Sequence, residues 1–250
     1  MTGNGTLDSG SLFAAQASGT AITIGGGGTP AIAGDCNTGG GSVSGSGPCA
    51  SVETTGAQLG PYNTAVTEAN ALLAAIPTQP ADQTFATLTN GNTVTGVSGM
   101  NFVDVDTISL PSSNDILTFS GPSDAVIVVR VASTFSLTGT NSEIALGGSL
   151  TASNLLFYLG GAANLTGANG VYLRGTFLGT STCSSGNSFD LDGAIVCAGN
   201  ISLTNSPTIN SMPFPYEVAL VPEPGTYALT CIGLLGLLYF RRRKLRPVQN

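Results

Sequence analysis

The segments Asp124-Ala-Val-Ile-Val-Val-Arg130 and Leu155-Leu-Phe-Tyr-Leu159 are the most informative parts of this 250-residue sequence for its fold. Both are apolar almost without interruption, whereas a strand with one solvent-facing side alternates apolar and polar residues. Strands of this kind are buried on both faces, as in parallel sheets. The two segments therefore favour a parallel β architecture.

Short β-prone runs, separated by Gly, Ser, Asn and Thr, surround these segments from Phe85 to Ile209. Turn phrases such as Leu137-Thr-Gly-Thr140 recur between them without a strict period. The pattern predicts an all-β solenoid, with an immunoglobulin-like sandwich as the alternative. The runs cover residues 107–110, 116–119, 125–131, 135–137, 143–146, 155–159, 170–173, 176–178, 194–197 and 200–203.

One α-helix is predicted over residues 63–76, flanking the solenoid. Asn63 is a suitable N-cap, and Pro77 ends the pattern. Before this helix, residues 1–60 hold 16 of the 35 glycines and are expected to be rich in loops. The apolar residues that recur at helical spacing are Ala65, Val66, Ala69, Leu72, Leu73 and Ile76.

Charge is scarce and unevenly distributed. Residues 1–240 carry 2 basic and 14 acidic groups, a formal charge of −12, whereas residues 241–250 carry +5. The absence of histidine excludes Ser-His-Asp and Cys-His nucleophiles and histidine-based zinc sites. Two arginines cannot supply a nucleic-acid-binding patch in the body. We expect neither a cofactor nor a metal site.

Two acidic pairs are candidates for an enzymatic site. Asp104 and Asp106, and likewise Asp190 and Asp192, would point to one side of a strand. With Arg174 nearby to act as the base, such a pair would suit a calcium-assisted polysaccharide lyase. Calcium sites need several oxygen ligands, so solvated turn aspartates are the simpler interpretation, and we predict that the protein is not an enzyme.

Hydroxyl-bearing fragments raise the alternative of ice binding. Ice recognition requires a flat, stiff face with small hydroxyl residues in register. Residues 134–136, 138–140 and 151–153 have this chemistry but do not repeat at a constant coil length. Exposed Ser and Thr of a low-charge exported protein are the simpler explanation.

Four cysteines form two local pairs, Cys36 with Cys49 and Cys183 with Cys197, thirteen and fourteen residues apart. Neither pair has the CxxC spacing of a zinc or redox motif, so disulfides are favoured over free buried thiols. Disulfides would place the body in an oxidising compartment.

The C-terminus has three parts in a fixed order. Residues 213–226 form a linker that ends in Val221, Pro222, Glu223, Pro224, Gly225 and Thr226; residues 227–240 are uncharged; and Arg241, Arg242, Arg243 and Lys244 follow in the basic tail, residues 241–250. The uncharged run would span about 21 Å as a helix, which is short for a membrane but can be extended by snorkelling arginines. We predict a transmembrane helix over 227–240 with a cytoplasmic basic tail. The alternative is a buried core helix.

This arrangement resembles the PEP-CTERM sorting signal. The resemblance implies a transient membrane anchor that an exosortase recognises through Pro222, Glu223 and Pro224, in bacteria that make extracellular polysaccharide. Export also requires an N-terminal signal peptide, and residues 1–10 have neither a cationic nor an apolar region. We therefore expect an upstream extension that encodes one.

The body, residues 61–212, resembles the choice-of-anchor A proteins and the ice-binding-like adhesin domain. The resemblance rests on the order of the helix and of segments such as Thr93-Val-Thr-Gly-Val97, Asp115-Ile-Leu-Thr-Phe119, Arg174-Gly-Thr-Phe-Leu178 and Leu191-Asp-Gly-Ala-Ile195. It implies a right-handed β-helix with a helix alongside. The prediction is thus an exported surface or matrix protein, anchored in the inner membrane before it reaches the surface, with adhesion or extracellular polysaccharide binding as its function.

Overall fold

The computed structural model describes residues 12–14, 20–24, 31–32, 36–38, 42–45, 52–53, 74–161, 163–166, 169–205 and 207–210. The chain divides into two compact units, Met1–Pro215 and Tyr216–Asn250. All described residues belong to the first unit.

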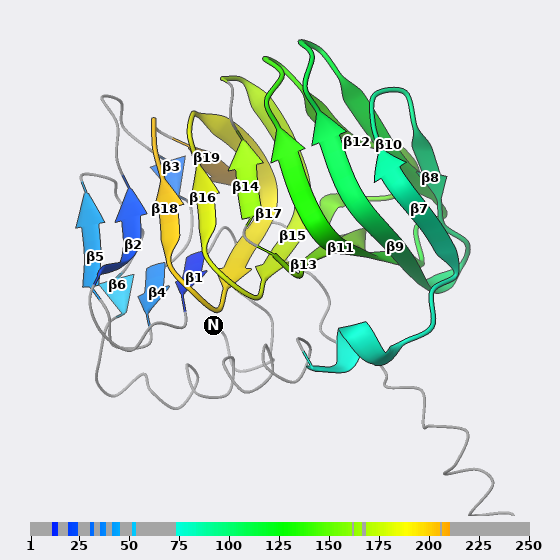
Figure 1. The fold of residues 1–250 in the computed structure, drawn as a ribbon, viewed down its shortest axis with the longest axis horizontal. Helices are drawn as coiled ribbons and strands as arrows, with labels where there is room; N and C mark the ends of the chain where they lie inside the picture. Colours follow the sequence, from blue (N-terminus) through cyan, green and yellow to red (C-terminus); the bar gives the residue numbers. More distant parts are fainter. Residues whose placement is uncertain are drawn as a thin grey trace, which may run out of the picture. The chain divides into compact units, whose positions relative to one another are not determined.

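The body is a solenoid made of one 19-stranded sheet, in which every pairing between the described strands is parallel. The sheet winds into coils with three sides, which we call sides A, B and C (Figure 1). The prediction of an all-β fold with parallel strands is confirmed. The sandwich alternative is wrong, because a sandwich requires antiparallel neighbours.

Each side is a ladder of strands from successive coils. Side A contains β7 (Gln83–Leu88), the first parts of β9 (Gly99–Leu110) and β11 (Ala125–Leu137), β13 (Leu155–Leu159), the second parts of β15 (Val171–Gly179) and β17 (Phe189–Cys197), β1 (Leu12–Ala14), β4 (Cys36–Thr38) and β6 (Val52–Glu53). Side B contains the end of β7, the second parts of β9 and β11, then β14 (Ala163–Thr166), β16 (Cys183–Ser185), β18 (Ile201–Leu203), β2 (Thr20–Ile24) and β5 (Ser42–Gly45). Side C contains β8 (Thr93–Thr95), β10 (Ile116–Gly121), β12 (Glu143–Gly148), the first parts of β15 and β17, β19 (Thr208–Asn210) and β3 (Ala31–Ile32).

The N-terminal strands complete the solenoid at the end opposite to β7. Leu12 of β1 is in register with Ile195 of β17 on one side and with Cys36 of β4 on the other. Figure 1 accordingly shows the blue N-terminal strands beside the yellow and orange strands of the last coils. The glycine-rich segment, expected to consist mainly of loops, contributes six strands to the same sheet.

The coils differ in length although the ladders stay in register. Register partners on neighbouring coils are separated by one full coil of chain. The chain from Glu143 to its partner Tyr172 is much longer than the chain from Val171 to its partner Phe189. The extra residues lie in the connections between sides. Variable connections explain why the sequence shows no strict period.

The interior is filled by apolar side chains from all three sides. Phe157 stacks on Phe177 with ring centroids 4.8 Å apart, and it meets Phe119 and Phe135 edge to face. Side A has a second apolar layer on its outer surface, since Val128 and Leu156 are almost fully buried without belonging to the interior cluster. These residues come from the two segments predicted to be buried on both faces.

Two glycines allow strands to turn from side C to side A. Gly175 and Gly193 are register partners with φ of 113° and 149°. A Cβ on Gly193 would overlap the carbonyl oxygen of Gly175, so these turns require glycine at this position.

Most of the predicted flanking α-helix, residues 63–73, lies outside the described residues. Residues 74–75 are α-helical and lead directly into the 3-10 helix η1 (Ile76–Thr78), after which Gln79 is extended; no α-helix of greater length occurs among the described residues. A second 3-10 helix, η2 (Ala152–Asn154), precedes β13. No helix among the described residues is long and apolar enough to cross a membrane. The predicted membrane helix, residues 227–240, lies outside them.

Candidate functional site

Side B presents one continuous row of small hydroxyl and amide residues. Successive strands place one such residue at the same register position, between two inward apolar neighbours in most strands. The row runs over seven coils and would be roughly 29 Å long at the usual strand spacing. Its members are Ser109, Ser136, Asn164, Ser184, Ser202, Thr23 and Ser44.

A shorter threonine row lies beside it. Thr87, Thr107 and Thr134 are register partners on β7, β9 and β11. Thr107 and Ser109 project from the same side of one strand, so the two rows are about 6.6–6.8 Å apart. The described outward positions in these two rows carry no charge. Side B is thus a neutral, hydroxyl-bearing surface held by a backbone ladder.

The structure divides the hydroxyl fragments that the sequence singled out. Thr134 and Ser136 lie in the rows of side B. Thr138 and Thr140 lie in the connection that follows β11, and Thr151 caps η2, where its backbone N–H donates to Asn154 Oδ1 at 2.8 Å. The sequence reasoning missed most of the row. A recurring triplet of apolar residue, Ser or Thr, and apolar residue would have revealed it, as in Ile108-Ser-Leu110 and Ile201-Ser-Leu203.

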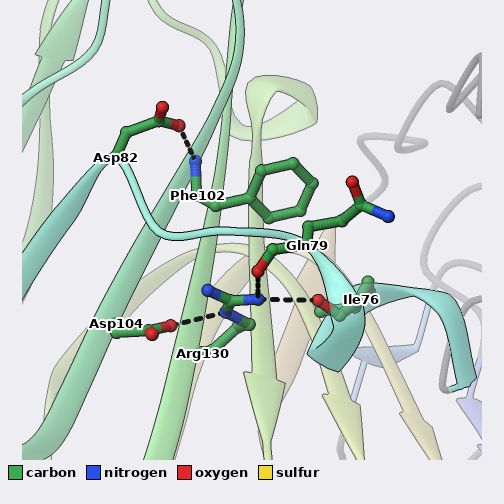
Figure 2. Close-up of polar contacts among 6 residues, drawn as sticks. All are labelled: Ile76, Gln79, Asp82, Phe102, Asp104 and Arg130. Atoms are coloured by element: carbon green, nitrogen blue, oxygen red, sulfur yellow. Dashed lines mark hydrogen bonds and ion pairs between the residues drawn. The ribbon is translucent and has the colours of Figure 1, made fainter. Parts of the chain in front are cut away.

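Side A is held to the preceding chain by Arg130. We call residues 76–81 the strap. The Arg130 guanidinium donates to the carbonyl oxygens of Ile76 (2.9 Å) and Gln79 (2.5 Å), and its Nε donates to Asp104 Oδ1 at 2.5 Å (Figure 2). It also lies over the ring of Phe102. These contacts fix the strap to the outer surface of side A.

Side C carries a charged network around Arg174. The guanidinium donates to Glu143 Oε1 (2.5 Å) and to the carbonyl oxygen of Ile144 (3.2 Å), and it lies 3.7 Å from Asp192 Oδ2. Asp192 also accepts a hydrogen bond from Asn210. Arg174 and Asp192 are therefore adjacent, as the lyase hypothesis requires.

The contacts of Arg174 do not fit the role of a base in that hypothesis, because its donors are engaged by carboxylate and carbonyl oxygens. Asp190 is exposed and is the register partner of Tyr172 on the neighbouring coil. Asp104 forms an ion pair with Arg130, so its carboxylate is not available to share a site with Asp106. The described residues contain no group of three or more His, Cys, Asp or Glu suited to a metal ion.

A disulfide joins Cys183 to Cys197, with the two Cα atoms 6.2 Å apart. Cys36 is also disulfide-bonded, and Cys49 lies outside the described residues. The sorting segment, residues 221–226, also lies outside the described residues, as does the basic cluster at Arg241, Arg242, Arg243 and Lys244.

Comparison with solved structures identifies the fold class as that of ice-binding β-solenoids. An ice-binding protein from the Antarctic ascomycete Antarctomyces psychrotrophicus superposes with a TM-score of 0.60 at 21% identity, covering 81% of this chain and 94% of that one. An ice-binding protein from an Antarctic biological consortium gives a TM-score of 0.62 at 20% identity, covering 79% and 87%. The ice-binding protein LeIBP from an Arctic yeast gives 0.61 at 18% identity, covering 80% and 91%.

The C-terminal segment of the chain matches a known protein-sorting motif. Residues 220–244 match the model of the PEP-CTERM protein-sorting motif. The resemblance read from the sequence is confirmed, and the motif implies export, C-terminal membrane anchoring and processing by an exosortase. No curated protein matches the chain.

Proposed function

We propose that the protein is a non-enzymatic, surface-delivered ice-binding protein: a solenoid body that binds ice through side B, sorted by its C-terminal motif. The observation that carries this proposal is the row of seven hydroxyl or amide residues in register. The fold is shared with ice-binding proteins at low sequence identity, and a shared fold alone does not indicate ice binding. The proposal therefore rests on the row.

The geometry of side B suits contact with ordered water. Neighbouring strands repeat about every 4.7–4.9 Å and alternate residues along a strand about every 6.6–6.8 Å, which gives a two-dimensional array of hydroxyl groups. The side chains are short, so holding them in one conformation costs little entropy. A charged side chain would bind its own hydration shell, and none projects from the described positions of the two rows. The surface can therefore hold a sheet of water by hydrogen bonds.

Ice binding is tested by a bulky substitution within the row. Ser136 has a neighbour on each side, Ser109 and Asn164, so Ser136→Tyr interrupts the array. Thr118→Tyr on side C is the matched control, since Thr118 also projects outward from a strand. We expect the purified chain to inhibit ice recrystallisation at micromolar concentration, Ser136→Tyr to abolish the effect and Thr118→Tyr to retain it. An inactive wild-type chain, or equal loss in both variants, would refute ice binding.

The sorting role is assigned to residues 221–226 and the basic cluster. Val221 to Thr226 would be recognised by the exosortase, residues 227–240 would hold the chain in the inner membrane, and Arg241 to Lys244 would stop translocation. In cells that encode an exosortase, Glu223→Ala should leave the protein in the inner-membrane fraction, whereas Glu217→Ala, outside the motif, should be sorted normally. Normal sorting of Glu223→Ala would contradict this assignment.

Adhesion is a second candidate function, and the outer surface of side C favours it. Ile116 and Tyr172 are 41% and 42% exposed there, on the same row as Glu143 and Asp190. Exposed large side chains among polar ones are typical of contact surfaces. The resemblance of the body to choice-of-anchor A surface proteins is consistent with this second candidate function. Tyr172→Ser should reduce attachment of cells to surfaces if side C is the adhesive side, and unchanged attachment would exclude side C.

A further inference from the structure

A groove of about 740 Å³ crosses four coils where sides A and B meet. Its floor is the outward row Thr84, Asp104, Arg130 and Tyr158, which are register partners on β7, β9, β11 and β13. The strap forms one wall. The volume falls within the range of about 300–1,000 Å³ that is typical of small-ligand sites.

Small residues keep the opposite rim of the groove open. Ala132 and Gly160 lie there, where side A turns towards side B. The four coils give the groove a length of about 14 Å at the usual strand spacing. An extended ligand with repeating units fits this shape better than a single compact one.

The polar groups of the groove are fixed and carry a small negative charge. Arg130 is 10% exposed and is held by Asp104 and by two strap carbonyl oxygens, so it is pre-oriented and neutralises Asp104 (Figure 2). Asp106 lines the same groove and is exposed. Among the residues that the structure describes, it has no hydrogen-bond or ion-pair partner. Asp106 therefore offers two carboxylate oxygens as acceptors.

We propose that this groove binds a short neutral oligosaccharide. Sugar hydroxyl groups would donate to Asp106 and Thr84, and a pyranose ring would pack its apolar face on Tyr158, whose side chain offers a flat apolar body with a polar tip. An anionic glycan would be repelled by the unpaired carboxylate and by the net charge of −1 among Asp104, Asp106 and Arg130. A calcium ion would need more oxygen ligands than two carboxylates provide.

Such a site is independent of ice binding, because the groove lies at the edge of side A and shares no residue with the rows of side B. Ser136→Tyr should therefore leave sugar binding unchanged. The two proposals can fail separately.

The experiment is calorimetric titration of the full chain in a zwitterionic, sugar-free detergent. The probes are cellotriose, maltotriose and mannotriose, with trigalacturonate as the acidic comparison. We expect at least one neutral trisaccharide to bind with a millimolar or lower Kd, and trigalacturonate to bind at least about tenfold more weakly. Ala132→Phe, which fills the groove, should abolish binding. Asp106→Asn should weaken it about tenfold, the effect of losing a hydrogen bond to a charged acceptor.

Asp190→Asn is the matched control, since it removes an exposed carboxylate of side C and should leave the affinity unchanged. Urea-unfolding midpoints equal to wild type establish that each variant is folded. Asp106→Asn alters only an exposed group, so it keeps the test decisive if Ala132→Phe fails to fold. Absence of binding by all three neutral probes at millimolar concentration would overturn the proposal. So would binding that survives both groove variants, or tighter binding of trigalacturonate than of any neutral probe.

Discussion

Arg130 is predicted to contribute more to stability than any other charged residue among those described. Its side chain is 10% exposed and serves three acceptors: Asp104 and the carbonyl oxygens of Ile76 and Gln79. The perturbation is Arg130→Met, which keeps much of the apolar stem and removes all donors. It leaves two strap carbonyl oxygens without their donor and returns Asp104 to water.

The magnitude follows from these contacts. A hydrogen bond from a charged donor contributes about 1.5–3 kcal/mol, so two carbonyl acceptors give at least about 3 kcal/mol. The ion pair adds at most about 1 kcal/mol, because Asp104 is 43% exposed and well screened. We therefore expect Arg130→Met to lower the free energy of unfolding by at least about 3 kcal/mol. Release of the strap alone should accelerate its amide exchange by about two orders of magnitude.

The assays are urea unfolding and hydrogen exchange of the strap, read at the Gln79 amide, which donates to the Ile76 carbonyl oxygen; Pro77 and Pro80 carry no amide hydrogen. Arg174→Met is the matched control: Arg174 also meets two carboxylates and one carbonyl oxygen, but it is 28% exposed and holds no separate segment. Its loss should cost about 1–2 kcal/mol, because solvent screens these contacts. Equal destabilisation by the two variants, or unchanged exchange of the strap in Arg130→Met, would refute the role of Arg130 as a clamp.

Three further predictions concern the interior, and urea unfolding measures each of them. Phe157→Ala should cost about 3–5 kcal/mol, because the ring is surrounded by other aromatic rings; a cost below about 1 kcal/mol would contradict tight packing. Gly193→Ala should prevent stable folding because of its clash with a backbone carbonyl, whereas Gly91→Ala, which has φ of 77° and open space, should cost about 1 kcal/mol. Replacing Cys183 and Cys197 by Ala should cost about 3 kcal/mol, and equal stability of this variant and wild type would exclude a stabilising disulfide.

The sequence predicts the fold class well because burial on both faces leaves a direct trace in it. Apart from Arg130, the segments 125–131 and 155–159 are apolar or aromatic at inward and outward positions alike, and the structure buries most of both sets. Strands with short or polar outward residues were harder to predict. The strands β16 and β19 were missed, because their outward residues resemble those of turns.

For the hydroxyl row of side B, the sequence predicted the type of residue but not the alignment of these residues across the coils. Hydroxyl residues at 134 and 136 are visible in the sequence, but their alignment with residues 109, 164, 184 and 202 depends on connections whose length changes from coil to coil. No fixed period can recover such an alignment. Likewise, Arg130 and Asp104 lie on different coils, and only their register makes them partners. Register is set by backbone pairing between coils, which the local sequence pattern does not encode.

The position of the N-terminal strands determines when the hydroxyl row can be completed. β1 pairs with β17, which lies near the opposite end of the described chain, and Thr23 and Ser44 extend the row beyond Ser202. Pairing across such a separation is entropically costly and slow compared with the pairing of coils that follow one another in sequence. The row therefore remains incomplete until the chain has been made through Leu203, the last residue of β18, close to the sorting motif at residues 220–244. A body truncated before β18 would lose that strand and with it the surface on which the N-terminal strands of side B assemble.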